Sequence, residues 1–250
     1  MTTPGQPRVV VTGIGAVTPL GMDFPTSWRR LIEGADGAAP VTLFDVSGCR
    51  CRCGAQTELP DLPRFNAKQL RRLSRASRLV LPAAGEALNQ AGLLDVNGRA
   101  TPTQMPISVS TTGGGMALGE QFMRTLMSHR KARSYFLVSH YSAQQQMLDL
   151  QEDLGLYGPI TIIANACASG ANAIGHARDL IRAGVAECVL AGGYEALTEL
   201  IYVGFDCLQA MSTDRCRPFD TKRSGLMLGE AASFMVLESD RKSTRLNSSH

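Results

Sequence analysis

Cys167 lies where an apolar run ends and a helical pattern begins. The segment Pro159–Gly175 reads PITIIANACASGANAIG, and small residues on both sides of the cysteine leave room for a substrate at the sulfur. Backbone N–H groups converge at the start of a helix, and the positive end of the helix dipole favours a thiolate. The same N–H groups can hold an oxyanion when the sulfur attacks a carbonyl carbon. This position predicts a cysteine that carries an acyl group as a thioester, with a buried inert thiol as the alternative.

The elements that must position this cysteine follow from apolar runs of strand length and from helical spacings. Strands are predicted over Arg8–Gly13, Pro106–Ser110, Ile160–Ala164, Glu187–Ala191 and Ser233–Leu237. Helices are predicted over Asp23–Gly34, over Ser77–Ala91, and after Cys167 from the spacing of Ile174, Ala177 and Ile181 up to Gly184. The strand–helix–strand order of Pro159–Gly193 predicts a right-handed βαβ unit. We therefore expect an α/β fold with a parallel-dominated sheet between helices.

Several motifs of the chain resemble those of the β-ketoacyl-acyl-carrier-protein synthases, most of all the branch that elongates fatty acyl chains and its polyketide relatives. The matching stretches are RVVVTGIGAVTPLG near the N-terminus, Asn165–Gly170 (NACASG), Ala191–Glu195 (AGGYE), Gly204–Phe205, Arg217–Asp220 (RPFD), Arg223, Gly225 and Gly229–Glu230. Thiolases and the short-chain initiating synthases share the cysteine but lack the block that begins at RPFD. The resemblance extends from Arg8 to Leu237.

This resemblance implies the N-terminal half of a thiolase-like layered αβαβα fold, in which the cysteine heads a buried central helix. We expect the ketosynthase domain to occupy residues 1–238. Residues 239–250 read SDRKSTRLNSSH and contain one apolar residue, Leu246. This segment resembles translated sequencing-adapter text, and we expect it to be a non-native or disordered tail.

The resemblance also implies a reaction. Cys167 would take an acyl group from the phosphopantetheine thioester of an acyl carrier protein, and a malonyl-carrier would lose carbon dioxide and attack the acyl-cysteine. No cofactor of the protein's own is expected, because the carrier protein brings the phosphopantetheine. Members of the family form homodimers, so we expect a homodimer for the intact protein.

The catalytic histidines of the family belong to motifs in its second half. None of the four histidines of this chain lies in such a motif; they are His129, His140, His176 and His250. His176 follows Cys167 by nine residues and is expected to face away from the sulfur. The chain as given is therefore expected to be inactive in condensation. The alternatives are a ketosynthase of a polyketide or polyene pathway, and a non-catalytic fragment or partner subunit, against which Cys167 argues.

Two further residues are candidates for substrate binding on the basis of the resemblance. Gly113 lies in the glycine-rich loop Thr111–Met116 and aligns where relatives often carry a branched apolar residue, so we expect a deeper or wider acyl pocket. Phe205 matches a pocket-lining aromatic, with ordinary core packing as the alternative. A phosphate-binding loop is a weak interpretation of Thr111–Met116, because no Lys-Ser or Lys-Thr pair follows it.

The other charged, cysteine-rich and glycine-rich motifs are interpreted as structural. Arg217, Asp220 and Arg223 are expected to form an internal network of ion pairs and turns, and Glu230 is expected to accept hydrogen bonds from loop amides. The three cysteines of the CRCRC segment, Cys49, Cys51 and Cys53, are expected on one face of a strand rather than around a metal ion, because structural zinc favours CxxC spacing. A dinucleotide site at the Gly13–Gly15 turn is disfavoured, because Thr18 replaces the third glycine of that fingerprint.

Composition limits the remaining classes of function. A formal net charge of +3 is too small to indicate nucleic-acid binding. No apolar run reaches the length of a membrane helix. The seven cysteines have no disulfide-framework spacing, which favours the reducing cytoplasm. The basic stretch Lys68–Arg78 is interpreted as a solvated helix face, with docking of an acidic carrier as the alternative.

Overall fold

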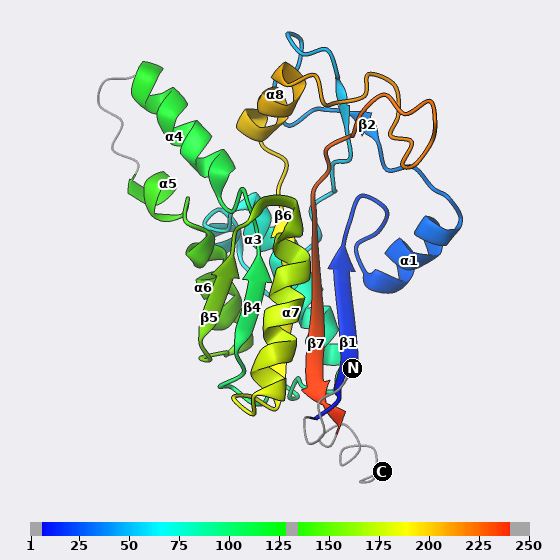
Figure 1. Cartoon of the computed structure of the whole chain (residues 1–250). Helices are drawn as coiled ribbons and strands as arrows, with labels where there is room; N and C mark the ends of the chain where they lie inside the picture. Colours follow the sequence, from blue (N-terminus) through cyan, green and yellow to red (C-terminus); the bar gives the residue numbers. More distant parts are fainter. Residues whose placement is uncertain (1–6, 129–134, 241–250) are drawn as a thin grey trace.

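The computed structural model describes residues 7–128 and 135–240 and contains a five-stranded sheet flanked by helices (Figure 1). In chain order the elements are β1 (Val9–Val17), α1 (Phe24–Ile32), β2 (Ala39–Pro40), β3 (Cys53–Gly54), α2 (Ala67–Leu70), α3 (Arg75–Gln90), β4 (Ile107–Ser110), α4 (Met116–Ser128), α5 (Tyr135–Ser139), α6 (Ala143–Leu154), β5 (Ile160–Ile163), α7 (Ser169–Arg182), β6 (Cys188–Glu195), α8 (Glu199–Cys207) and β7 (Ala231–Ser239). The five strands predicted for the sheet and all three predicted helices are therefore present.

The strand order of the main sheet is β1-β7-β6-β4-β5. Strand β4 pairs in parallel with both β5 and β6, whereas β7 is antiparallel to both β6 and β1. Four strands consequently run in one direction and only β7 opposes them, which confirms the parallel-dominated sheet. The predicted strand–helix–strand unit is β5–α7–β6, and β4 lies between its two strands.

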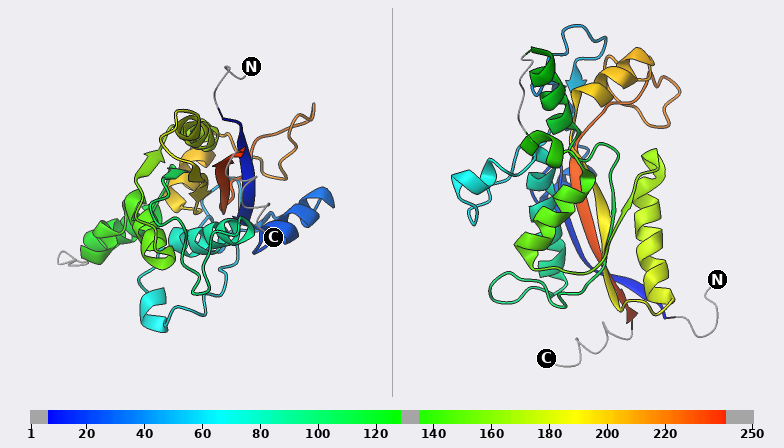
Figure 2. Two further views of the ribbon diagram at one scale, coloured as in Figure 1. Left: turned by 90° about the horizontal axis from the view of Figure 1, so that it is seen from below. Right: turned by 90° about the vertical axis from the view of Figure 1, so that its left-hand side faces the viewer.

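Helices cover both faces of this sheet (Figure 2). On one face, α3 and α6 bury residues such as Leu79, Leu88 and Leu150 against strand residues that include Leu190. On the other face, Ala177 and Ile181 of α7 pack against Val189 and Ala191 of β6. Because adjacent residues of β6 point to opposite faces, its continuous apolar sequence serves both layers. The α/β architecture is confirmed.

The helix that follows Cys167 differs from the expected buried central helix. Its buried residues are Ser169, Ala173, Ala177 and Ile181, which repeat every four residues and form a single stripe against the sheet. The side away from the sheet includes the exposed Asn172 and is not covered by any other element of the described residues. Helix α7 is therefore half-buried in this chain.

Polar side chains of α3 bind backbone N–H groups of β1 and of the first residue of α1. The Glu86 carboxylate accepts hydrogen bonds from the N–H groups of Ala16 and Phe24, at 2.9 Å from each nitrogen. Gln90 Oε1 accepts from the N–H of Ile14 at 2.6 Å. These contacts satisfy backbone donors that the sheet does not pair, and they fix where the β1–α1 loop meets α3.

The stability of this junction should depend on pH. Burial raises the pKa of Glu86 above its ordinary value of 4.5, although the N–H groups of Ala16 and Phe24 oppose this shift. The folded state then binds more protons than the unfolded state, so this carboxyl makes the stability fall as the pH rises from 4.5 through the raised pKa. We expect Glu86→Gln to remove this contribution. Urea unfolding of both proteins from pH 4 to pH 8 measures it, and a constant difference between them contradicts the expectation.

The C-terminal strand extends further than predicted. Ser239 pairs with Val9 within the β1–β7 ladder, and the N–H of Asp240 donates to the carbonyl oxygen of Arg8 at 2.9 Å. Both residues thus bond to the first strand, and the expected domain boundary after residue 238 stays a prediction. Most of the expected tail, residues 241–250, lies outside the described residues.

The CRCRC segment begins with a bend and irregular backbone and is mostly not the predicted strand. Only Cys53 belongs to β3, a two-residue strand that pairs with β2. The Asp206 carboxylate accepts from the N–H groups of Arg50 and Cys51 at 2.9 and 3.0 Å, so it holds the segment bent. Within residues 7–128 and 135–240, no group of three or more histidine, cysteine, aspartate or glutamate side chains could hold a metal ion.

The basic stretch Lys68–Arg78 is exposed over part of its length. Lys68, Arg71 and Arg72 are exposed, as expected of a solvated face, whereas Arg75 is half-buried and pairs with Glu230. In the part of the chain that the structure describes, no helix is long and apolar enough to cross a membrane.

Candidate active site

Cys167 lies in a single 3₁₀ turn, Ala166–Ala168, which joins the segment after β5 to α7. The cysteine is exposed in this chain, in contrast to the buried thiol of the alternative interpretation. Ala166, directly before it, has φ +58°, a left-handed conformation that is costly for a residue with a Cβ. Strained backbone of this kind is found at functional sites, where the surrounding structure must hold it in place. The predicted strand–cysteine–helix arrangement is confirmed.

A pocket of about 450 Å³ opens beside this turn, at the carboxyl ends of β4 and β6. Its lining residues come from the turn, from those two strand ends and from the segment that leads into β7; they include Ser110, Thr111, Ala166, Ser169, Gly170, Gly193 and Glu230. The carboxyl ends of parallel strands are where open α/β sheets bind ligands. Ala166 and Ser169, on either side of Cys167, form part of the pocket wall, whereas Cys167 itself is not among the lining residues.

The glycine-rich loop after β4 is wrapped around a carboxylate of the protein itself. Glu195 accepts from the Thr111 hydroxyl at 2.6 Å, from the Thr112 N–H at 3.0 Å and from the Gly113 N–H at 2.8 Å. These donors are consequently engaged and do not form an open phosphate cradle. Sequence reasoning gave Glu195 no role, because its three partners lie more than eighty residues earlier in the chain.

Gly113 is buried in this loop and is not part of the pocket lining. A Cβ built on Gly113 would lie 3.2 Å from Cδ1 of Ile201 and 3.4 Å from Oε1 of Glu195. The role of this glycine in setting pocket depth stays a prediction, and a side chain at this position would meet Ile201 on α8 and Glu195 in the pocket wall.

Phe205 packs in a second, smaller core at some remove from the turn. It is partly buried against a cluster that includes Val41, Cys51, Leu197 and Tyr202. Phe205 does not line the pocket beside Cys167. This environment matches core packing, and a substrate-contacting role for Phe205 stays a prediction.

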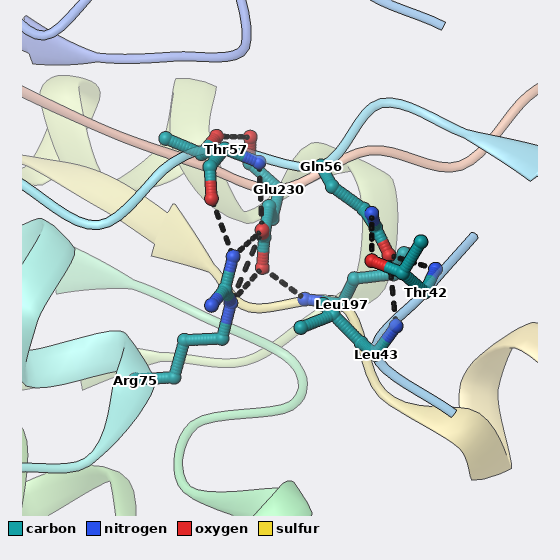
Figure 3. Close-up of polar contacts among 7 residues, drawn as sticks. All are labelled: Thr42, Leu43, Gln56, Thr57, Arg75, Leu197 and Glu230. Carbon is teal, nitrogen blue, oxygen red and sulfur yellow. Dashed lines mark hydrogen bonds and ion pairs between the residues drawn. The ribbon is translucent and has the colours of Figure 1, made fainter. Parts of the chain in front are cut away.

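Glu230 holds together several segments that are distant in the sequence (Figure 3). Its carboxylate accepts from the Thr57 N–H at 2.8 Å and from the Leu197 N–H at 3.0 Å, and it pairs with Arg75 at the start of α3. The Glu230 side chain is fully buried and that of Arg75 is 20% exposed. The prediction that Glu230 accepts from loop amides is confirmed, and its position in the pocket wall connects this support to the site.

The RPFD block forms turns, but it is neither internal nor paired as predicted. Arg217 pairs with Asp214, and Asp220 accepts from the Lys222 N–H at 2.6 Å. Arg223 donates to the carbonyl oxygen of Asp220 at 3.2 Å. Arg217 is half-buried, and the other members are exposed because no described element packs over the block.

The histidines do not join the site within the described residues. His140 bonds to the carbonyl oxygen of Phe136 through Nδ1 at 3.0 Å, and His176 lies on α7 about 13 Å along the helix from Cys167. Neither residue lines the pocket. His129 and His250 fall outside the described residues.

Comparison with known proteins gives a consistent picture. Residues 6–243 match the family model described as Beta-ketoacyl synthase, N-terminal domain. The chain is 34% identical to 3-oxoacyl-acyl-carrier-protein synthase 2 of Synechocystis sp. over 92% of its length and 57% of that protein. It is also 34% identical to Nodulation protein E of Rhizobium meliloti, covering 95% of this chain and 59% of that one. The chain thus spans less than two thirds of the length of these relatives.

Solved structures share the fold. The structure of the ishigamide ketosynthase/chain length factor superimposes with a TM-score of 0.88 and 26% identity, over 97% of this chain and 61% of that one. A beta-ketoacyl synthase from Burkholderia phymatum STM815 superimposes with a TM-score of 0.84 and 26% identity, over 96% of this chain and 61% of its own. The predicted thiolase-like ketosynthase fold is confirmed.

Proposed function

This chain belongs to the beta-ketoacyl synthase family, whose N-terminal domain it matches, and from this premise we propose that Cys167 is the residue that accepts the acyl group. The observation that carries the proposal is the exposed Cys167 in a strained turn at the start of α7, beside a pocket at the strand ends. The intact protein would use the acyl-cysteine in a decarboxylative condensation with malonyl-carrier protein.

The acylation step follows from this geometry. The Cys167 sulfur attacks the carbonyl carbon of the incoming thioester, and negative charge develops on the carbonyl oxygen. Backbone N–H groups at the turn and at the start of α7 stabilise that charge. The tetrahedral intermediate collapses, the bond to the pantetheine sulfur breaks, and the departing thiolate takes a proton. Because no histidine lines the pocket among the described residues, we propose that this chain stops at the acyl-enzyme.

We expect acyl carrier protein that carries a medium-chain acyl group to transfer it to Cys167, with a mass increase of one acyl group per chain. Intact-protein mass spectrometry measures the transfer. Cys167→Ala should abolish it, and Cys216→Ala, which removes another exposed thiol, should leave it unchanged. Equal transfer to the Cys167→Ala variant would show that the nucleophile lies elsewhere.

The fatty-acid type of substrate is favoured over a polyketide one. Relatives at 32–34% identity include 3-oxoacyl-acyl-carrier-protein synthase 2 from Synechocystis sp. and Staphylococcus aureus. The polyketide or polyene alternative rests on the likeness to the ishigamide ketosynthase at 26% identity. Comparing transfer of saturated and polyene acyl groups from the same carrier protein distinguishes them. A non-catalytic fragment or partner subunit would show no transfer to Cys167.

The same proposal extends to partners and setting. The acyl carrier protein is the partner that delivers the substrate, and its phosphopantetheine is the only prosthetic group required. The intact protein is proposed to be a homodimer. The reducing cytoplasm is the proposed location, because the seven cysteines have no disulfide-framework spacing.

Gly113 provides a test of acyl-chain selectivity. We expect Gly113→Ile to shift acylation of Cys167 toward shorter chains, because a side chain there must displace Ile201 or the loop that holds Glu195. The ratio of transfer from six-carbon and twelve-carbon acyl carrier proteins measures the shift. An unchanged ratio removes Gly113 from the determinants of chain length.

A further inference from the structure

The turn that presents Cys167 is held by one buried hydroxyl. Ser169 Oγ donates to the carbonyl oxygen of Ala166 at 2.6 Å and accepts from the N–H of Asn165 at 2.8 Å. The Ser169 backbone N–H also donates to the Ala166 carbonyl. The hydroxyl therefore uses one donor and one acceptor, and it closes a ring of hydrogen bonds around the cysteine.

This ring lies where the backbone needs support. Ala166 adopts φ +58°, and Asn165 before it is neither helical nor extended, with φ −127° and ψ 48°. A left-handed alanine persists only where the surrounding structure holds the backbone in that conformation. Ser169 is 4% exposed and bonds to groups on either side of the Asn165–Ala166 peptide bond, so it provides that constraint.

We propose that Ser169 is a positioning residue that locks the left-handed turn at Ala166 and so orients the sulfur and the N–H of Cys167 toward the incoming thioester. The inference rests on the proposed acyl-accepting function of Cys167. The hydroxyl itself touches no reacting atom. It acts through the Ala166 carbonyl and the Asn165 N–H, which set the direction of the peptide groups before the cysteine.

The test compares Ser169→Ala with Ser108→Ala as a matched control. Ser108 is also fully buried and donates its hydroxyl to a carbonyl of α7, that of Ala173, at 2.8 Å, but it does not contact the cysteine turn. The rate of Cys167 acylation by an acyl-pantetheine thioester is measured by peptide mass spectrometry. We expect Ser169→Ala to slow acylation about tenfold and Ser108→Ala to leave it within about twofold of the wild type. Ser169→Thr, which keeps the hydroxyl, should restore most of the rate.

Two readouts separate positioning from general stability. Alkylation by iodoacetamide reports unfolding at the buried thiols of Cys51 and Cys188, which should stay protected in Ser169→Ala. In an Ala166→Gly background, Ser169→Ala should reduce the rate of Cys167 acylation by less. The reason is that glycine accepts a positive φ without the hydrogen bonds of the Ser169 hydroxyl. Exposure of the two buried thiols, or an equal loss in both backgrounds, overturns the proposal.

The outcomes also separate this inference from the proposed function. A wild-type chain that is acylated at Cys167 as fast as its Ser169→Ala variant overturns the role of Ser169 alone. A wild-type chain that is not acylated at Cys167 overturns the proposed function itself.

Discussion

Glu230→Ala is expected to lower the free energy of unfolding by about 3 kcal/mol, the lower end of the range for breaking a buried ion pair. The reason is that Glu230 is fully buried while its partner Arg75 is 20% exposed, so the arginine left behind regains some contact with water. The N–H groups of Thr57 and Leu197 would lose their acceptor as well. Urea unfolding followed by circular dichroism measures the change.

A surface ion pair supplies the control for this prediction. Arg178 and Asp179 pair on α7 with side chains that are 52% and 63% exposed. Exposed pairs of this kind contribute at most about 1 kcal/mol, so Arg178→Ala should change the stability little. Glu230→Gln keeps one acceptor oxygen, so its free energy of unfolding should lie between those of Glu230→Ala and Arg178→Ala. Equal stability of Glu230→Ala and Arg178→Ala would contradict the structural role given to Glu230.

Gly15→Ala is the second substitution with a large expected effect. Strand β1 lies so close to α3 that a Cβ on Gly15 would overlap the carbonyl oxygen of Ala83 and lie 2.7 Å from the nitrogen of Ala87. Both atoms are helix backbone, so the conflict is relieved only if the helix and the strand move apart. We expect a loss of stability of about 3 kcal/mol, at the upper end for overpacking, measured by the same urea unfolding.

Gly85, on the same helix, is the matched control. A Cβ on Gly85 meets no atom within 4 Å. Since alanine is the better helix former, Gly85→Ala should raise the stability by about 0.5–1 kcal/mol. A Gly15→Ala protein as stable as the wild type would mean that β1 and α3 are not packed backbone to backbone.

Local signals explain what could be predicted from the sequence. The run Ile160–Ala164, the small residues around Cys167 and the spacing of Ile174, Ala177 and Ile181 are each readable within a few residues. They sufficed for the β5–turn–α7 unit that positions the thiol. Helix α6 offered similar signals, a Ser142 N-cap and a left-handed Gly155 at its end, and was missed only because its sequence is largely polar.

The remaining features depend on contacts between distant segments. The CRCRC segment alternates like a strand, yet Asp206, more than 150 residues later, bends it through two backbone N–H groups. Gly113 and Phe205 likewise owe their surroundings to α8 and the second core rather than to their own neighbours in the sequence. Ser169 lies only two residues after Cys167, but its role depends on the left-handed conformation of Ala166. An alanine at that position gives no sequence signal for a positive φ.

The most direct test of the account compares the thiols of one sample. The wild-type chain carries exposed cysteines at 167, 207 and 216, and only Cys167 lies in the turn beside the pocket. A brief reaction with acyl-pantetheine, followed by digestion and mass spectrometry, measures acylation at each thiol under identical conditions. Stabilisation of the oxyanion at the turn predicts acylation of Cys167 at least about tenfold faster than of Cys207 or Cys216. Equal acylation of the three thiols would contradict the proposal that this turn makes Cys167 the acyl-accepting nucleophile.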